Sequence, residues 1–472
     1  MSKKKKGQIN FTKYLAFFLV IVSLIVLFLI YFIGVLPIEH FLVLSALIVI
    51  IDLINIKLLL VKSKIQNALG IFFSLILIIF MTIGITYELN TIDFLKQFGF
   101  NSYNTENYNI VVLKDNNIKE LNDIKNKKIG HLNTDEHEGL NEATKRLKNK
   151  INYESVEIDD LTNLLNNLLD GNVQAIILED AQLNIIEEEN SEIYKKLEII
   201  YQIDIEVEIE KIGSSVDVTK DPFNILISGI DTYGSITKVS RSDVNILISV
   251  NPNTNTILLT TIPRDYYVLL PKFNEYDKLT HAGIYGIETT VKAVEELLNT
   301  NINYYIKVNF TSLIDIVDAF DGITINSNYE FTSQDGYYFK KGENYLDGPK
   351  ALSFARERKA FALGDRVRGE NQEIILEALI NKAMNPNVIT KYTELLNALK
   401  DKFITNITND EITKFIKKQI KENSKWNIEA ISLTGSDAFE TTYTYKNTKL
   451  YVMEPNGESV LSAQEKIKKI LN

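Results

Sequence analysis

The sequence of 472 residues contains no cysteine. Disulfide bonds, cysteine-ligated zinc, thiol catalysis and iron–sulfur clusters are therefore excluded. Only four histidines occur, and they support no Ser-His-Asp arrangement. The net charge is −10, from 51 basic and 61 acidic residues. This balance argues against a general nucleic-acid-binding protein, because such proteins need a basic surface.

Long apolar runs are present near the N-terminus, at about 14–36, 41–61 and 68–87. Each has about the 20 residues that a helix needs to cross a bilayer. A cleaved signal peptide would instead show one shorter run followed by a small-residue cleavage site. The runs therefore predict a membrane anchor over residues 1–90. The alternative is a set of apolar core helices in a soluble protein.

The flanking charges predict how this anchor is oriented. Lys3–Lys6 precede the first run, and Lys62 and Lys64 lie between the second and third, whereas Pro37–His40 contain no lysine or arginine. The positive-inside rule places the N-terminus and the second connection in the cytoplasm. Residues after about 88 are then extracellular.

The second apolar run contains an ionisable residue, Asp52, and Lys57 lies near its end. An ionisable residue inside a membrane is a functional hypothesis by default. Lys57 is close enough to the cytoplasmic end to extend its ammonium group to the interface. We expect Asp52 to contribute to helix packing rather than to a substrate site.

Residues 104–212 have the pattern of a small α/β accessory domain. Strands are expected at 108–113, 128–132, 173–178 and 203–211, and helices at 138–148 and 159–169. The segment resembles one lobe of a periplasmic solute-binding protein, but it shows no residue cluster specific for a solute, so an interaction module is the preferred interpretation. The acidic stretch Glu187–Glu192 is expected to be a solvated surface. Residues 213–221 are expected to form a linker.

The remainder, 221–472, alternates short strands with helices. Strands are expected at 224–227, 244–250, 256–262 and 304–308, and helices at 287–298, 313–320, 350–355, 372–384 and 410–422. This pattern predicts an α/β/α layered domain with a mixed central sheet.

Arginine is rare in this lysine-rich chain, and its placement is uneven. Of seven arginines, six lie between residues 241 and 368. Arginine holds phosphate or carboxylate through a planar two-point fork, which lysine lacks. The cluster therefore indicates an oxyanion site. The alternative is a set of structural ion pairs with aspartate or glutamate.

Two aspartates accompany this cluster at predicted strand ends. Asp231 follows one strand, Asp243 directly precedes the next, and Arg264 follows a third after Pro263. Open α/β sheets bind ligands at strand ends, and paired carboxylates suit Mg²⁺ that is shared with substrate phosphates. Turn capping is the alternative role for each aspartate.

A further polar group lies at helical spacing: Asp365, Arg368 and Gln372. If the segment is helical, Arg368 and Gln372 share a face with Ile375 and Leu379. A polar tip on an apolar stripe would suit a lipid phosphate. Such a stripe is more often part of a core.

Four ordered strings resemble the LytR-CpsA-Psr family of Gram-positive bacteria: NILISGID, SRSDVNILISVNPNTNTILLTTIPRD, YDKLTHAGIYG and GPKALSFARERKAFALGDRVRGENQ. They make 221–384 the motif core of a catalytic domain over 221–472. The membrane spans and the extra α/β domain look like the CpsA-type members linked to capsule assembly. The resemblance implies a phosphotransferase that moves a glycopolymer, capsular polysaccharide first and wall teichoic acid second, from undecaprenyl pyrophosphate to peptidoglycan.

The resemblance also implies residue roles. It makes Asp231 and Asp243 ligands of Mg²⁺. It implies catalytic roles for these two and for Arg241, Arg264, Arg356 and Arg358, and binding of the lipid pyrophosphate by Arg264, Arg356, Arg358, Asp365, Arg368 and Gln372. Arg366 matches no fixed family position, and Asn371 stands where the family often has arginine. We expect His281 to serve packing or the pocket edge.

Other activities fit the same residues. The implied partners are the lipid-linked polymer, peptidoglycan and the bilayer, with no nucleic acid. A polyprenyl-pyrophosphate hydrolase would use the same site with water as the acceptor. A non-enzymatic regulator or scaffold that binds the lipid carrier is the other alternative.

Overall fold

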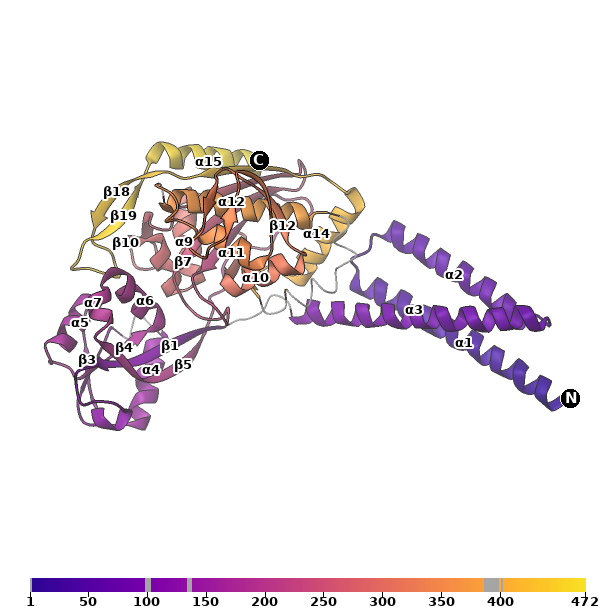
Figure 1. Ribbon diagram of the computed structural model, residues 1–472, viewed down its shortest axis with the longest axis horizontal. Coiled ribbons are helices and arrows are strands. Elements are labelled where there is room, and N and C mark those ends of the chain that lie inside the picture. The colour runs from indigo at the N-terminus through magenta and orange to yellow at the C-terminus, as the bar shows by residue number, and fades with distance from the viewer. Residues whose placement is uncertain (1, 98–102, 134–137, 363, 386–398, 400–401) are drawn as a thin grey trace. The chain divides into compact units, whose positions relative to one another are not determined.

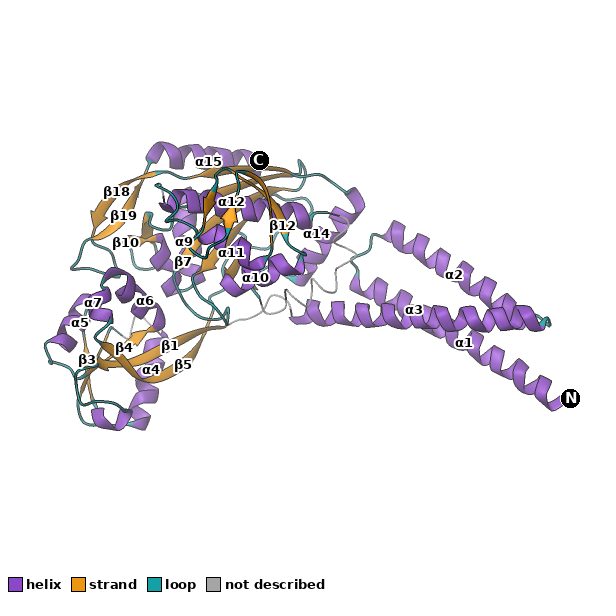
Figure 2. Ribbon diagram, viewed as in Figure 1, coloured by secondary structure: helices purple, strands orange, loops and turns teal. Residues whose placement is uncertain are grey.

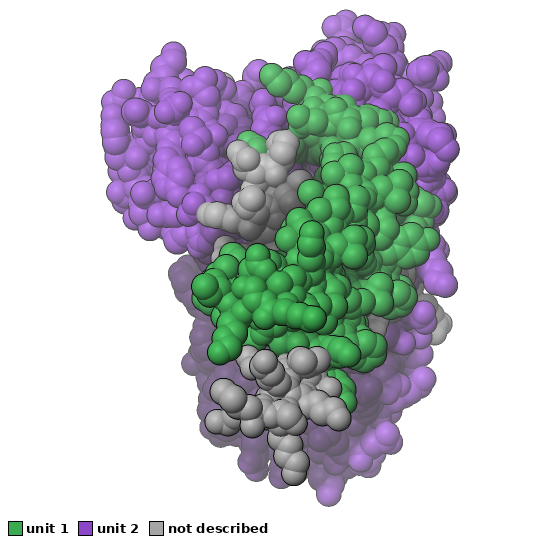
Figure 3. Space-filling view, turned by 90° about the vertical axis from the view of Figure 1, so that its right-hand side faces the viewer, with its two compact units in different colours: residues 1–98, 384–400, 408–425 green, residues 99–383, 401–407, 426–472 purple. Residues whose placement is uncertain are grey.

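The computed structural model describes residues 2–97, 103–133, 138–362, 364–385, 399 and 402–472 (Figure 1). Its helices and strands are distinguished in Figure 2. The chain divides into two compact units, shown in different colours in Figure 3. Unit 1 comprises residues 1–98, 384–400 and 408–425, and unit 2 comprises residues 99–383, 401–407 and 426–472.

Unit 1 contains the apolar N-terminal helices. They are α1 (Ser2–Ile33), α2 (Ile38–Leu60) and α3 (Lys64–Gln97), and α14 (Asn409–Glu422) also belongs to this unit. Within the described residues, three helices are long and apolar enough to cross a membrane, over Phe11–Ile33, Ile38–Leu60 and Lys64–Ile92. The three predicted runs are therefore helical and of spanning length.

Polar side chains of α2 face the neighbouring helices. Asp52 and Asn55 are buried, and Asn55 Nδ2 donates a hydrogen bond of 2.6 Å to Ser74 Oγ on α3. Lys57 is exposed. This arrangement agrees with a helix-packing role for the polar face of α2.

A small sheet in unit 2 has the strand order β3-β2-β4-β1-β5. Strand β2 runs parallel to β3 and β4, whereas β1 runs antiparallel to β4 and β5. The helix predicted for residues 159–169 is α5, which begins after the N-cap Asp160 and buries four leucines on one face. The elements are β1 (Tyr103–Leu113), β2 (Lys128–His131), α4 (Glu138–Lys150), β3 (Glu154–Glu157), α5 (Leu161–Leu169), β4 (Ala175–Glu179), α6 (Asp180–Glu189), α7 (Ser191–Tyr194) and β5 (Leu197–Glu208).

The central sheet of unit 2 is mixed, as the strand pattern predicts. Its order is β16-β11-β6-β7-β8-β17, with β11 parallel to β6, β8 parallel to β17, and β7 antiparallel to both of its neighbours. The strands are β6 (Phe223–Ile230), β7 (Ser242–Asn251), β8 (Thr256–Thr261), β11 (Tyr304–Asn309), β16 (Ile404–Thr405) and β17 (Asn427–Ser432).

Helices cover both faces of the central sheet, which gives the expected α/β/α layering. On one face, Leu226, Leu247 and Leu258 pack in one core with α9 (Ile287–Leu298) and α15 (Gly457–Leu471). On the other face lies α12 (Gly364–Ala383), where Ser432 Oγ donates a hydrogen bond of 2.7 Å to Glu373 Oε1. Burial of these apolar side chains stabilises the layering.

The remaining elements of unit 2 extend this framework. A second core joins Phe331, Phe339 and Phe354 with Ile375 of α12. The elements are β9 (Tyr267–Leu270), β10 (Glu275–Lys278), α8 (Leu279–Ala282), α10 (Phe310–Ala319), β12 (Ile323–Ser327), β13 (Phe331–Thr332), β14 (Tyr338–Phe339), β15 (Gly342–Leu346), α11 (Gly348–Arg356), β18 (Gly435–Glu440) and β19 (Leu450–Pro455).

Some element boundaries differ from those predicted. Strand β7 begins at Ser242, so Asp243 lies inside the strand rather than directly before it. Helix α12 begins at Gly364, eight residues before the predicted start at Gln372, because Arg368 and Gln372 continue its helical spacing. Strand β5 begins at Leu197 instead of Ile203, since it pairs along the whole of β1.

Candidate functional site

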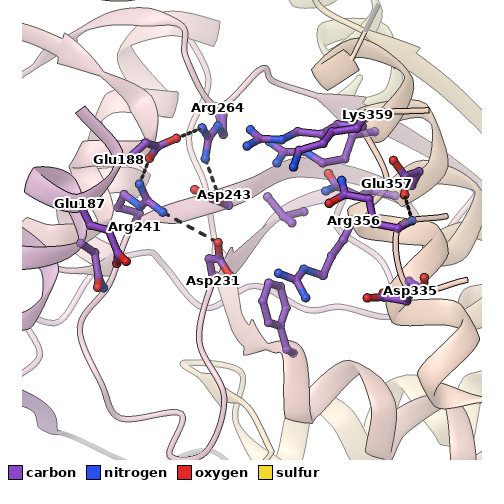
Figure 4. Close-up of a pocket in the computed structure, with 18 residues that line it drawn as sticks. Glu187, Glu188, Asp231, Arg241, Asp243, Arg264, Asp335, Arg356, Glu357 and Lys359 are labelled. Atoms are coloured by element: carbon purple, nitrogen blue, oxygen red, sulfur yellow. Dashed lines mark hydrogen bonds and ion pairs between the residues drawn. The ribbon is translucent and has the colours of Figure 1, made fainter. Parts of the chain in front are cut away.

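A cavity of about 510 Å³ lies at the edge of the central sheet where β6 and β8 end and β7 begins (Figure 4). Its wall also includes parts of α6, α10, α11 and α12. The described residues that line it are Asn184, Glu187, Glu188, Asp231, Arg241, Asp243, Val244, Arg264, Phe310, Gln334, Asp335, Ser353, Arg356, Glu357, Arg358, Lys359, Arg368 and Gln372.

The antiparallel pairing of β6 with β7 brings the first acidic and basic side chains together. Ile230 pairs with Ser242, so Asp231 and Arg241 leave the sheet side by side. Arg241 Nη2 lies 3.8 Å from Asp231 Oδ2. The Arg241 side chain is 11% exposed, which means that its charge depends on nearby carboxylates or on an anionic ligand.

Arg264 is more enclosed than Arg241, with a side chain that is 8% exposed. It follows β8 and Pro263, whose missing N–H prevents the chain from continuing the ladder there. Its Nη1 contacts Asp243 Oδ2 at 2.8 Å. Thr280 Oγ1 donates to the other oxygen of Asp243, Oδ1, also at 2.8 Å. Asp243 is thereby held in one orientation towards the cavity.

The two aspartates are electrostatically different. Burial and the neighbouring Asp243 carboxylate raise the pKa of Asp231 above its ordinary value. Burial also acts to raise the pKa of Asp243, but Arg264 and Arg241 outweigh it and lower this pKa to about 2. Burial lowers the pKa of Arg241. The site therefore keeps Asp243 ionised at neutral pH by placing two guanidinium groups around it.

The opposite wall carries arginines from α11, α12 and the segment between them. Arg356, at the end of α11, lies over the ring of Phe310 at 4.1 Å and donates to Tyr233 Oη at 3.3 Å. Arg358 is exposed in the following segment, and Arg368 is partly buried on α12. All three line the cavity, so positive charge surrounds it from both sides.

Gln372 also lines the cavity from α12, and its Nε2 donates to the Ala355 carbonyl at 3.3 Å. The neighbouring Ile375 is buried in the phenylalanine-rich core, so the apolar stripe below Gln372 is core rather than an open path for a lipid tail. Asp365 lies in α12, and its side chain is outside the described residues.

Three residues discussed from the sequence lie away from the cavity. Arg366 is exposed and contacts Glu370 at 3.9 Å. Asn371 is fully buried, and its Nδ2 donates to the Phe354 carbonyl at 3.1 Å, so it does not reach a ligand in this cavity. His281 is buried with its Nδ1 2.7 Å from Asp277 Oδ1, which agrees with the packing role expected for it.

The acidic stretch Glu187–Glu192 is largely exposed, as expected, but two of its glutamates also make specific contacts. Glu188 forms ion pairs with Arg241 and Arg264, and Glu189 contacts Lys278 at 2.7 Å. These contacts join α6 to residues that flank β7 and β8 and to Lys278 at the end of β10. A run of glutamates usually indicates solvent exposure, and no spacing signal relates residue 188 to arginines more than 50 positions away.

The two cavity aspartates fit Mg²⁺ only if water and a substrate phosphate supply its other ligands. Among the described residues, no group of three or more histidine, aspartate or glutamate side chains is arranged to hold a metal ion. Asp231 and Asp243 supply oxygen ligands, and Mg²⁺ commonly takes one or two carboxylates and completes its shell with water and substrate phosphate. Burial and the nearby Asp243 carboxylate raise the pKa of Asp231, and a cation bound by both carboxylates would offset these effects.

Two family models match parts of this chain. Residues 182–468 match the LytR-CpsA-Psr family, and residues 100–214 match the NMT1/THI5-like family. The chain is similar to the polyisoprenyl-teichoic acid–peptidoglycan teichoic acid transferase TagU of Bacillus subtilis, with 39% identity over 194 residues, 41% of this chain and 62% of the relative. It is similar to the Enterococcus faecalis protein of that name, with 38% identity over 198 residues, 41% of this chain and 65% of the relative.

Similar solved structures include that of B. subtilis TagU, with 32% identity, a TM-score of 0.43, and coverage of 54% of this chain and 98% of that chain. Another is TagT with bound octaprenyl pyrophosphate lipid, with 28% identity, a TM-score of 0.41, and coverage of 55% and 93%. The chain spans less than two thirds of the length of the two TagU relatives compared by sequence. Because the family match at residues 182–468 extends over more than half of the sequence, the chain belongs to the LytR-CpsA-Psr family.

Proposed function

We propose that this protein is a membrane-anchored phosphotransferase that moves a glycopolymer from an undecaprenyl-pyrophosphate carrier to peptidoglycan. The observation that carries the proposal is the cavity in which arginines from two walls surround Asp231 and Asp243. Guanidinium groups on both sides suit a ligand with two linked phosphates. The names of the similar TagU proteins, which specify transfer to peptidoglycan, support the same reaction class.

The reaction is a phosphoryl transfer between two oxygens. An acceptor sugar hydroxyl attacks the phosphorus that bears the glycopolymer, a new P–O bond forms, and the bond from that phosphorus to the bridging oxygen breaks. Polyprenyl phosphate leaves with the electron pair, and the acceptor hydroxyl loses its proton. Catalysis of this kind rests mainly on positioning and on stabilising the developing charge.

The proposed roles follow from the geometry. Arg241 and Arg264, deep in the cavity, hold one phosphate, while Arg356 and Arg358 approach the other from the opposite wall. The ring of Phe310 fixes the Arg356 guanidinium in place. Arg368, Gln372 and Asp365 on α12 complete the binding set. Mg²⁺, held by Asp231 and Asp243, would neutralise phosphate charge.

The polymer is the finer part of the proposal. The membrane spans and the extra α/β domain favoured capsular polysaccharide, whereas the similar proteins are named for teichoic acid. Wall teichoic acid is therefore the first donor to test, and capsular polysaccharide is the second. The cavity binds the pyrophosphate common to both.

The proposed location of the protein is the cell membrane, with the candidate site on the side where the wall is built. Residues 1–90 form the anchor of a Gram-positive-type cell membrane, 104–212 the accessory domain and 221–472 the catalytic domain. The lysine distribution supports an N-terminus in the cytoplasm and an extracellular chain after about residue 88. A polymer on a flipped lipid carrier and peptidoglycan both lie on that side.

The test uses the full chain in detergent micelles with Mg²⁺, lipid-pyrophosphate-linked wall teichoic acid precursor and peptidoglycan fragments. Mass spectrometry should detect a phosphodiester-linked adduct that is lost with chelator. Arg358→Lys keeps the charge but removes the fork, so the adduct yield should fall at least about tenfold. Arg366→Lys is the matched control, because Arg366 lies outside the cavity and contacts Glu370.

The other outcomes identify the alternatives. Free phosphorylated sugar without adduct would show a hydrolase. Tight lipid binding without turnover on wall teichoic acid or capsular donors would support a regulator or scaffold. Equal loss of adduct in Arg358→Lys and Arg366→Lys would contradict the assignment of the cavity.

A further inference from the structure

Helix α6 directly follows strand β4 of the small sheet, but one of its faces forms part of the wall of the cavity of the candidate site. Asn184, Glu187 and Glu188 line the cavity, and their spacing of three and four residues puts them on one side of the helix. In Figure 4, Glu188 lies between the guanidinium groups of Arg241 and Arg264. One end of the candidate site therefore comes from outside the central sheet.

The two oxygens of Glu188 each contact a different arginine. Oε1 lies 2.6 Å from Arg264 Nη2, and Oε2 forms an ion pair with Arg241 Nη1. A carboxylate that bridges two guanidinium groups has the charge and the two-point geometry that these groups offer to a phosphate. Arg241 and Arg264 are only 11% and 8% exposed, so an incoming phosphate meets guanidinium groups that are already occupied on this side.

The position of Glu188 allows its side chain to leave without movement of α6. The adjacent Glu189 holds the end of the helix through its contact of 2.7 Å with Lys278, whose side chain is 7% exposed. Glu188 is less enclosed, at 36% exposure. The helix end is thus anchored at Glu189, while the preceding side chain, Glu188, has access to solvent.

We propose that Glu188 is an internal competitor that occupies the proposed phosphate-binding arginines until a pyrophosphate ligand displaces it. The proposal rests on the proposed function, because it assumes that Arg241 and Arg264 bind the pyrophosphate of the donor lipid. It assigns the α6 segment a regulatory role in the same site. Competition of this kind raises the apparent Kd to the intrinsic Kd divided by the fraction of time in which the arginines are accessible.

The test measures binding of geranylgeranyl pyrophosphate with Mg²⁺ to the full chain in detergent micelles. Glu188→Gln removes the negative charge at nearly constant shape and should tighten binding about tenfold if Glu188 occupies the arginines about 90% of the time. Glu188→Asp, with a shorter arm that cannot reach both arginines equally, should also tighten binding. Glu189→Gln is the matched control, because it removes the negative charge that pairs with Lys278 at the adjacent position of α6, and it should leave the affinity within about twofold of wild type.

Suppose that wild type binds the lipid and that Arg358→Lys does not. Unchanged or weaker binding in Glu188→Gln would then overturn this inference and leave the proposed function intact. Glu188 would then orient the arginines. If neither wild type nor Glu188→Gln binds the lipid, the proposed function fails together with the inference. Equal tightening in Glu189→Gln would also overturn it, since the effect would then come from loosening α6. Thermal unfolding of each variant checks that the fold is retained.

Discussion

The Arg264→Lys substitution tests whether the central guanidinium of the cavity acts through its two-point geometry. In the structure, Arg264 contacts Asp243 at 2.8 Å and Glu188 at 2.6 Å through different nitrogens. Lysine keeps the positive charge, but all its donors lie on one nitrogen, so it cannot reproduce the separate Nη1 and Nη2 contacts of the guanidinium. The substitution therefore removes one charge-assisted hydrogen bond while it retains the net charge.

The expected magnitude follows from that loss. A hydrogen bond to a charged group contributes about 1.5–3 kcal/mol. If the same nitrogen contacts the phosphate in the transition state, kcat/KM for polymer transfer should fall about 10- to 150-fold. The low exposure of Arg264, 8%, means that solvent compensates little for the lost contact.

The assay is steady-state transfer from the lipid-linked donor to peptidoglycan fragments, with Arg366→Lys as the control. Arg366 is exposed and outside the cavity, so its kcat/KM should remain within about twofold of wild type. An Arg264→Lys enzyme with unchanged kcat/KM and unchanged thermal stability would refute the reasoning. A loss of activity that only accompanies unfolding would show a structural role instead.

Three further predictions concern stability and topology. The folded pKa of Asp243, about 2, lies below its ordinary value because Arg264 and Arg241 outweigh the effect of burial, so the stability that it contributes above pH 4 should be lost between pH 4 and 2. Urea unfolding of Arg264→Gln should show a weaker pH dependence in that window, and an unchanged dependence would contradict the pairing. His281→Ala should reduce the free energy of unfolding by about 1–3 kcal/mol, since it removes a buried partner of the Asp277 carboxylate, while kcat/KM stays within twofold. In the cysteine-free chain, a single cysteine at exposed Asn117 should react with a membrane-impermeant maleimide in intact cells and one at exposed Ser63 should not, and the reverse labelling would invert the proposed topology.

The layered fold follows closely from the sequence pattern. The alternation of short strands with helices predicted most elements of unit 2, because burial of one face imposes a period on each element. Boundaries were less accurate, and Asp243 lies inside β7 rather than before it. Strand ends depend on pairing with a neighbour, here Ile230 with Ser242, which no local pattern specifies.

Because arginine is rare in this chain, its placement predicted which side chains gather around one cavity. Arg241, Arg264, Arg356, Arg358 and Arg368 all line one cavity. The rarity of arginine does not distinguish Arg366, which lies outside the cavity, from the five arginines that line it. The family resemblance made that distinction, and the structure agrees with it.

The sequence by itself determined the chemistry that is available: a cysteine-free chain, apolar helices of spanning length, a mixed α/β fold, and an arginine cluster with two aspartates. Only the tertiary structure decided which groups meet. Glu188 is part of an exposed acidic run, and no sequence pattern indicates that α6 carries it to Arg241 and Arg264. Asn371, one position from Gln372, faces the core instead. The reason is that ion pairs and ligand sites depend on three-dimensional proximity, which arises from strand order and helix packing and has no regular spacing along the chain.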